Sequence, residues 1–67
     1  MPSITLHEWS DLHRAARNRG GRLHVEYGSD NTRGRVFRVT QASVVVQLDG
    51  DDRPRPLHPA DVRLARR

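Results

Sequence analysis

The chain has 67 residues and carries twelve basic residues, all of them arginine, against eight acidic ones, so its formal net charge is +4 with the histidines neutral. A chain of this length forms one domain with a small core, which excludes a large enzyme with a deep cofactor cleft. The absence of cysteine excludes disulfide bonds, cysteine-based zinc sites and thiol catalysis. We therefore expect residues 1–67 to form a single domain with a core held together by packing alone.

The sequence contains no long apolar run and no charged-then-apolar start of the kind that signal peptides have. This pattern predicts a cytoplasmic protein without a membrane partner. Seven of the twelve arginines lie between residues 12 and 40, where there are only two acidic residues. Codon usage in a GC-rich genome explains the choice of arginine over lysine. The position of the arginines indicates which part of the chain could meet an acidic partner.

Residues 6–18 have the pattern of an amphipathic helix. Thr5 and Glu8 have the spacing of a capping box, in which each side chain bonds the backbone amide of the other residue. Apolar residues then recur every three or four positions, at Leu6, Trp9, Leu12 and Ala16. Gly20 and Gly21 end the helix, because glycine favours the backbone conformation that follows a helix C-terminus.

After residue 21 the apolar positions alternate with polar ones, which is the pattern of half-buried strands. Five strands are predicted, at about residues 22–27, 32–40, 44–48, 53–57 and 62–64, with one helical turn at 58–61. The alternation slips once in the second strand, which indicates a bulge or a strong bend. We therefore predict a mainly β protein with one N-terminal α-helix and a five-stranded, strongly bent antiparallel small barrel over about residues 22–65.

This layout resembles the SH3-like small barrels, and within them the Sm-like branch, which includes bacterial RNA chaperones of the Hfq family and an inhibitor of the termination factor Rho. The resemblance rests on the element lengths, on Gly34 early in the bent strand, and on a turn at His58 that leads into Val62. It implies a small-barrel fold and either RNA or a protein as partner. It also makes His58 a candidate nucleic-acid contact.

The sequence departs from the Sm-like pattern in the fourth strand. Sm-like rings close by pairing the fourth strand of one subunit with the fifth strand of the next. Pro54 and Pro56 lack backbone N–H groups, and because they are two residues apart they remove donors from the same edge. Leu57 stands where the resemblance implies a lysine, and no stacking aromatic residue lies near Ala42. We therefore expect a monomer or a small dimer rather than a hexameric ring.

The main candidate for a functional surface is a group of arginines around the first two strands. Its members are Arg22, Arg33, Arg35 and Arg38. Each guanidinium that contacts a phosphate releases a counterion, so such a group predicts salt-sensitive binding of nucleic acid. A solvated strand face without any ligand would have the same sequence, and both interpretations stay open at this point.

An aromatic residue among these arginines would give single-stranded bases a surface on which to stack. The candidates are Tyr27 and Phe37. A chain with only three aromatic residues needs most of them in its core, so we expect Trp9 and Phe37 to be buried. Tyr27 is then the residue that remains for stacking.

Other kinds of chemistry are not supported by the sequence. Ser10 and His13 lie one helical turn apart, but a serine nucleophile also needs an oxyanion hole and a cleft that excludes water. The histidines lack zinc-type spacing, and the acidic turn around Gly50 lacks the length and flanking helices of a calcium-binding loop. We therefore expect no catalytic residues, no metal and no cofactor.

Two functions remain as hypotheses. The first is a small non-enzymatic regulator that binds nucleic acid, RNA before DNA, through an arginine-rich barrel surface. The alternative is a protein-interaction module or inhibitor that attaches to a larger machine of transcription or defence.

Overall fold

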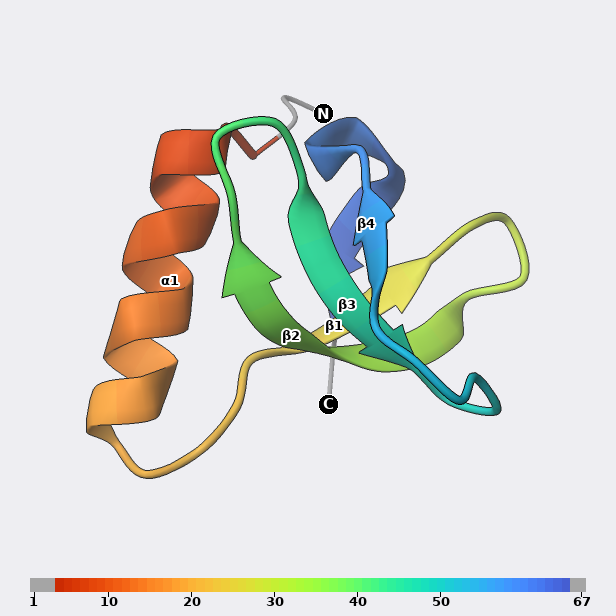
Figure 1. Cartoon of the computed structure of the whole chain (residues 1–67), viewed down its shortest axis with the longest axis horizontal. Helices are drawn as coiled ribbons and strands as arrows, with labels where there is room; N and C mark the ends of the chain where they lie inside the picture. The colour runs from red at the N-terminus through yellow and green to blue at the C-terminus, as the bar shows by residue number, and fades with distance from the viewer. Residues whose placement is uncertain (1–3, 66–67) are drawn as a thin grey trace.

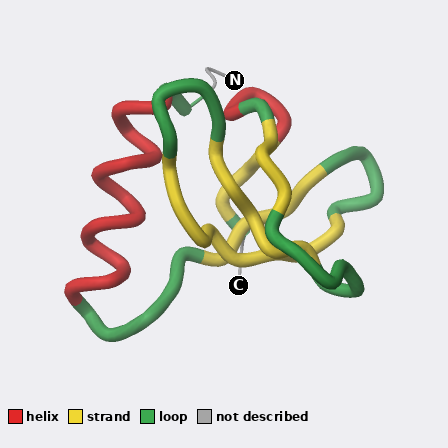
Figure 2. Tube along the Cα trace, viewed as in Figure 1, coloured by secondary structure: helices red, strands yellow, loops and turns green. Residues whose placement is uncertain are grey.

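The computed structural model describes residues 4–65 and contains one helix beside a curled sheet (Figure 1). The elements are α1 (Leu6–Asn18), β1 (His24–Tyr27), β2 (Thr32–Val39), β3 (Val44–Leu48), β4 (Arg55–Leu57), the one-turn 3-10 helix η1 (Pro59–Asp61) and β5 (Val62–Leu64). All strand pairs are antiparallel, in the order β4-β3-β2-β1-β5. The sheet curls into a half-barrel, so the predicted mainly β class is confirmed. Figure 2 shows the loops and turns, in green, that connect the strands.

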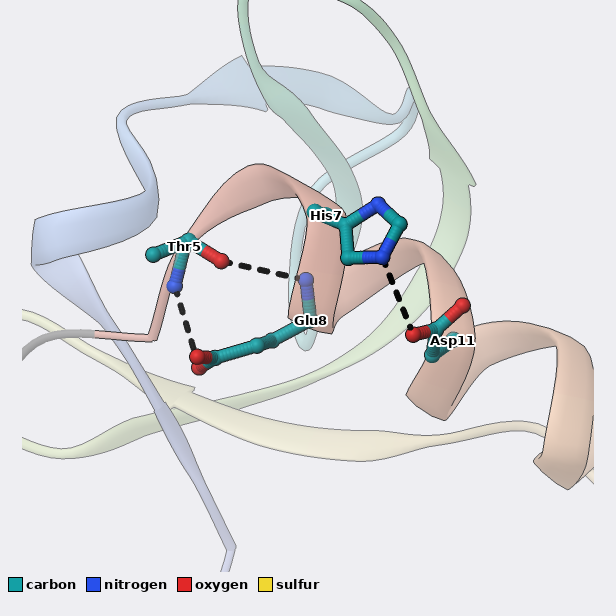
Figure 3. Close-up of polar contacts among 4 residues, drawn as sticks. All are labelled: Thr5, His7, Glu8 and Asp11. Atoms are coloured by element: carbon teal, nitrogen blue, oxygen red, sulfur yellow. Dashed lines mark hydrogen bonds and ion pairs between the residues drawn. The ribbon is translucent and has the colours of Figure 1, made fainter.

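Helix α1 begins and ends at the residues that the sequence predicts. The Glu8 N–H donates to Thr5 Oγ1 at 3.2 Å, and the Thr5 N–H donates to Glu8 Oε2 at 3.3 Å, which completes the capping box (Figure 3). At the other end, Gly20 adopts a φ of +78°, a conformation that side chains disfavour. The first amides of a helix lack partners within the helix, and the capping box supplies side-chain partners here for those of Thr5 and Glu8.

The core lies between α1 and the inner face of the half-barrel. Trp9 is 0% exposed, as the sequence predicts, and α1 packs against β2. The strand residues that form the core with Trp9 are Val25, Val36, Val44, Val46, Leu48, Leu57 and Val62. They alternate with outward-facing residues, because successive side chains of a strand point to opposite faces.

Strand β2 bends around the core at two places. At Gly34, a Cβ atom would lie 2.7 Å from Val46 Cγ1 and 2.9 Å from the backbone oxygen of Gln47, so only glycine fits between β2 and β3. Further along, the register with β3 shifts, which leaves Phe37 as an extra residue without a cross-strand partner. The predicted break in alternation is therefore a β-bulge.

Two predicted strands are shorter in the structure. Strand β1 begins at His24 rather than at residue 22, and β4 begins at Arg55 rather than at residue 53. The connection before β4 is a wide turn in which the Gln47 side-chain amide donates to the Asp51 carbonyl. This side-chain bond holds residues 49–54 in a loop instead of in the β3–β4 ladder.

Candidate nucleic-acid interface

The three predicted arginines of β2 lie on one face of the strand. Arg33 and Arg35 alternate with the buried residues of β2 and are exposed. The bulge then restores the alternation, because Arg38 lies opposite the outward-facing Val45 of β3 and is also exposed. The three arginines therefore lie on the outer face of the half-barrel.

Phe37 lies on this face as well, and the prediction that it is buried was wrong. Its side chain is 48% exposed, because the bulge makes it the extra residue of the strand and turns it away from the core. The Arg22 guanidinium carbon lies 5.7 Å from the centre of the Phe37 ring, which is the distance of a cation–π contact. A backbone bond of 2.9 Å from the Val36 N–H to the Leu23 carbonyl holds the two segments together.

Tyr27 and His58, the other two predicted contacts, lie elsewhere. Tyr27 is half-buried and packs against the core, with Val25, on the face of β1 opposite to the arginines. His58 is exposed at the start of η1, where its Nδ1 accepts a hydrogen bond from the Ala60 N–H at 3.1 Å. The structure therefore places Arg33, Arg35 and Arg38 on the outer face of β2 and Arg22 beside Phe37, and it leaves Tyr27 and His58 outside this group.

We call the group formed by Arg22, Arg33, Arg35, Phe37 and Arg38 the β2 surface. Within residues 4–65, none of its arginines has a carboxylate oxygen within ion-pair distance; the ion pairs there are His7–Asp11 and Arg55–Asp51. The guanidinium groups are thus available to an external anion.

One carboxylate does lie on the same face as the β2 surface. Glu26 of β1 is the cross-strand neighbour of Arg33 on one side and of Arg63 on the other. Its negative charge lowers the positive potential at the Arg33 end of the surface. The Phe37 end, next to Arg22 and Arg38, has no acidic cross-strand neighbour.

The basic region extends from the β2 surface to the end of α1. Burial is the main cause that lowers the pKa of His13, and the positive charges of Arg17 and Arg22 lower it further. Arg17 and Arg22 also line one shallow cleft with Gly20 and Gly21. The closeness of Arg17 to Arg22 depends on the path of the connection between α1 and β1.

Two other features are absent from the described residues. Within residues 4–65, no three histidine or carboxylate side chains are grouped closely enough to hold a metal ion. Over the same part of the chain, no helix has the length and apolar character needed to cross a bilayer. Comparisons with protein-family models, with curated proteins and with solved structures found no match for this chain.

Proposed function

We propose that the β2 surface binds single-stranded nucleic acid, RNA before DNA, without catalysing a reaction. The observation that carries this proposal is the exposed Phe37 ring with the Arg22 guanidinium beside it, next to Arg38. An exposed ring accepts the face of any base, while neighbouring guanidinium groups contact phosphates. Bases inside a duplex are already stacked on each other, so this arrangement favours unpaired strands.

The preference for RNA over DNA rests on the resemblance of the sequence layout to the Sm-like branch. Arginine–phosphate contacts and stacking do not distinguish ribose from deoxyribose, since that distinction requires a contact to the 2′-hydroxyl. Matched uridine and thymidine oligonucleotides of twelve residues decide this part of the proposal.

The number of arginines sets the expected salt dependence. If all four arginines of the β2 surface contact phosphates, the logarithm of the affinity should fall with the logarithm of salt with a slope of about 2.8. Affinity should then decrease about 50-fold between 50 and 200 mM salt. Fluorescence anisotropy with a labelled oligonucleotide measures both the affinity and the slope.

Two substitutions separate stacking from charge. Phe37→Ala should weaken binding about tenfold and leave the salt slope unchanged, because it removes a stacking contact and no charge. Arg38→Gln should weaken binding and lower the slope by about 0.7. The matched control is Arg53→Gln, which removes an exposed arginine from the loop before β4. Wild-type affinity for Phe37→Ala, or equal losses for Arg38→Gln and Arg53→Gln, would contradict the proposed surface.

The opposite change is expected at Glu26. Glu26→Gln removes the carboxylate between Arg33 and Arg63, so binding of the oligonucleotide should become a few-fold tighter. A neutral result would show that the bound strand does not extend to the Arg33 end of the surface.

A further inference from the structure

The two edges of the sheet differ in the hydrogen-bonding groups that they present. Pro56 of β4 lies opposite Val45 of β3. The two residues form a non-hydrogen-bonded pair, and the hydrogen bonds between β3 and β4 are made by the pairs on either side of it. Pro56, and Pro54 two residues earlier, therefore face the outer edge with their nitrogens, which carry no hydrogen. The outer edge of β4 has carbonyl acceptors and no donors, so it cannot pair with another strand in the regular way.

The outer edge of β5 keeps one free donor among the described residues, because the outward Val62 N–H already donates to the Pro59 carbonyl of η1. The Ala65 N–H donates to the His24 carbonyl of β1 at 3.1 Å, which sets the phase of the β1–β5 ladder. Leu64 and Val25 thus form a non-hydrogen-bonded pair, so the backbone amide and carbonyl of Leu64 point away from β1. Because β5 pairs only with β1, these groups lie at the open end of the sheet.

The side chains of β5 offer a different contact on each face. Leu64 lies on the inner side of the sheet at its end, and its side chain is 41% exposed, one of two large apolar side chains exposed within residues 4–65. Arg63 lies on the outer side, where its guanidinium donates to the Gly28 carbonyl and to Asn31 Oδ1. Within residues 4–65 it forms no ion pair, and the carboxylate nearest to it in the ladder is that of its cross-strand neighbour Glu26.

We propose that β5 accepts an extended segment of a protein partner by strand addition, and that this segment alternates apolar and acidic residues. Its backbone would bond to the outward groups of Leu64, its apolar side chains would cover Leu64, and its carboxylates would face Arg63. A second copy of this chain is a poor occupant, since pairing two β5 strands brings the Arg63 charges of both copies close together. This edge is separate from the β2 surface, so a protein partner and a nucleic acid would use different parts of the molecule.

Titration of the ¹⁵N-labelled chain with a capped eight-residue peptide of alternating valine and glutamate tests this proposal. The expected chemical-shift changes are centred on residues 62–65 and on β1, and the Leu64 amide should exchange more slowly with solvent. A peptide with lysine in place of glutamate should bind at least tenfold more weakly. Equal binding of the two peptides, changes centred on β2 or β4, or no change at millimolar peptide would overturn the proposal.

Substitutions at Leu64 test directly the hydrogen bond that its backbone N–H would donate to the peptide. Leu64→Pro removes the outward donor and leaves the β1 ladder intact, so it should weaken peptide binding at least tenfold. Leu64→Val keeps the donor and an apolar side chain and should bind nearly as the wild type does. If Leu64→Pro fails to fold, a synthetic chain methylated at the Leu64 nitrogen replaces it. Wild-type binding by the chain without this donor would refute strand addition, whereas Arg33→Gln should not alter peptide binding.

Discussion

The close approach of β2 and β3 at Gly34 makes a quantitative prediction about stability. In Gly34→Ala, the new methyl group would lie 2.7 Å from Val46 Cγ1 and 3.0 Å from Leu48 Cδ2, both in the core. It would also lie 2.9 Å from the backbone oxygen of Gln47, which cannot move without disturbing the sheet. Overpacking of this kind costs about 2 kcal/mol, which for a domain of this size lowers the Tm by about 8–16 °C.

Thermal unfolding followed by circular dichroism measures this effect, with Gly21→Ala as the matched control. A Cβ at Gly21 would meet only the Ala16 carbonyl oxygen, at 4.0 Å, so its Tm should stay within about 4 °C of the wild-type value. Both variants make the same chemical change, and they differ in the space around the new atom. If the two variants unfold at the same temperature, the explanation of the β2 bend by steric exclusion at Gly34 is wrong.

Three further predictions concern the helix cap, the half-buried His13 and the β4 edge. Thr5→Ala should lower the stability by about 1 kcal/mol in urea unfolding, whereas Thr5→Ser should not. Because the pKa of His13 is lowered in the folded protein, the stability it contributes is present above about pH 6.5 and decreases as the pH falls below it. The urea midpoint should therefore be lower at pH 5.0 than at pH 7.5, and His13→Gln should reduce the difference. Light scattering should show a monomer or small dimer for the wild type, and larger, concentration-dependent assemblies when Pro54 and Pro56 are both replaced by valine; a stable wild-type hexamer would contradict this account of the edge.

The helix and the approximate positions of the strands were predictable because their signals are local. The capping box needs only Thr5 and Glu8, and the end of the helix needs only the glycine pair that follows. Alternation within each strand likewise follows from the residues of that strand. These signals require no knowledge of what the rest of the chain does.

The composition of the candidate site was predictable only in part. Alternation alone places Arg33 and Arg35 on one face, but the position of Arg38 depends on which residue of β2 is the extra one. Several positions for the bulge fit the sequence equally well, and the cross-strand register with β3 decides among them. The same register exposes Phe37, which explains why the sequence assigned stacking to Tyr27.

The contact between Arg22 and Phe37 could not be predicted from either segment. It depends on the path from α1 to β1, which the backbone bond between Val36 and Leu23 fixes against β2. The same holds for the lowered pKa of His13, whose causes come from the end of α1 and from the following connection.

Because of the β2 bulge, the residue proposed to stack on a base, Phe37, is not one of the residues that pair with β3. Val36 pairs with Val46 and Arg38 with Val45, so the cross-strand register is continuous on either side of Phe37. The core therefore does not depend on which side chain stands there. If the β2 surface binds nucleic acid as proposed, replacing Phe37 by a larger aromatic or an aliphatic side chain should alter the ligand preference and leave the barrel unchanged.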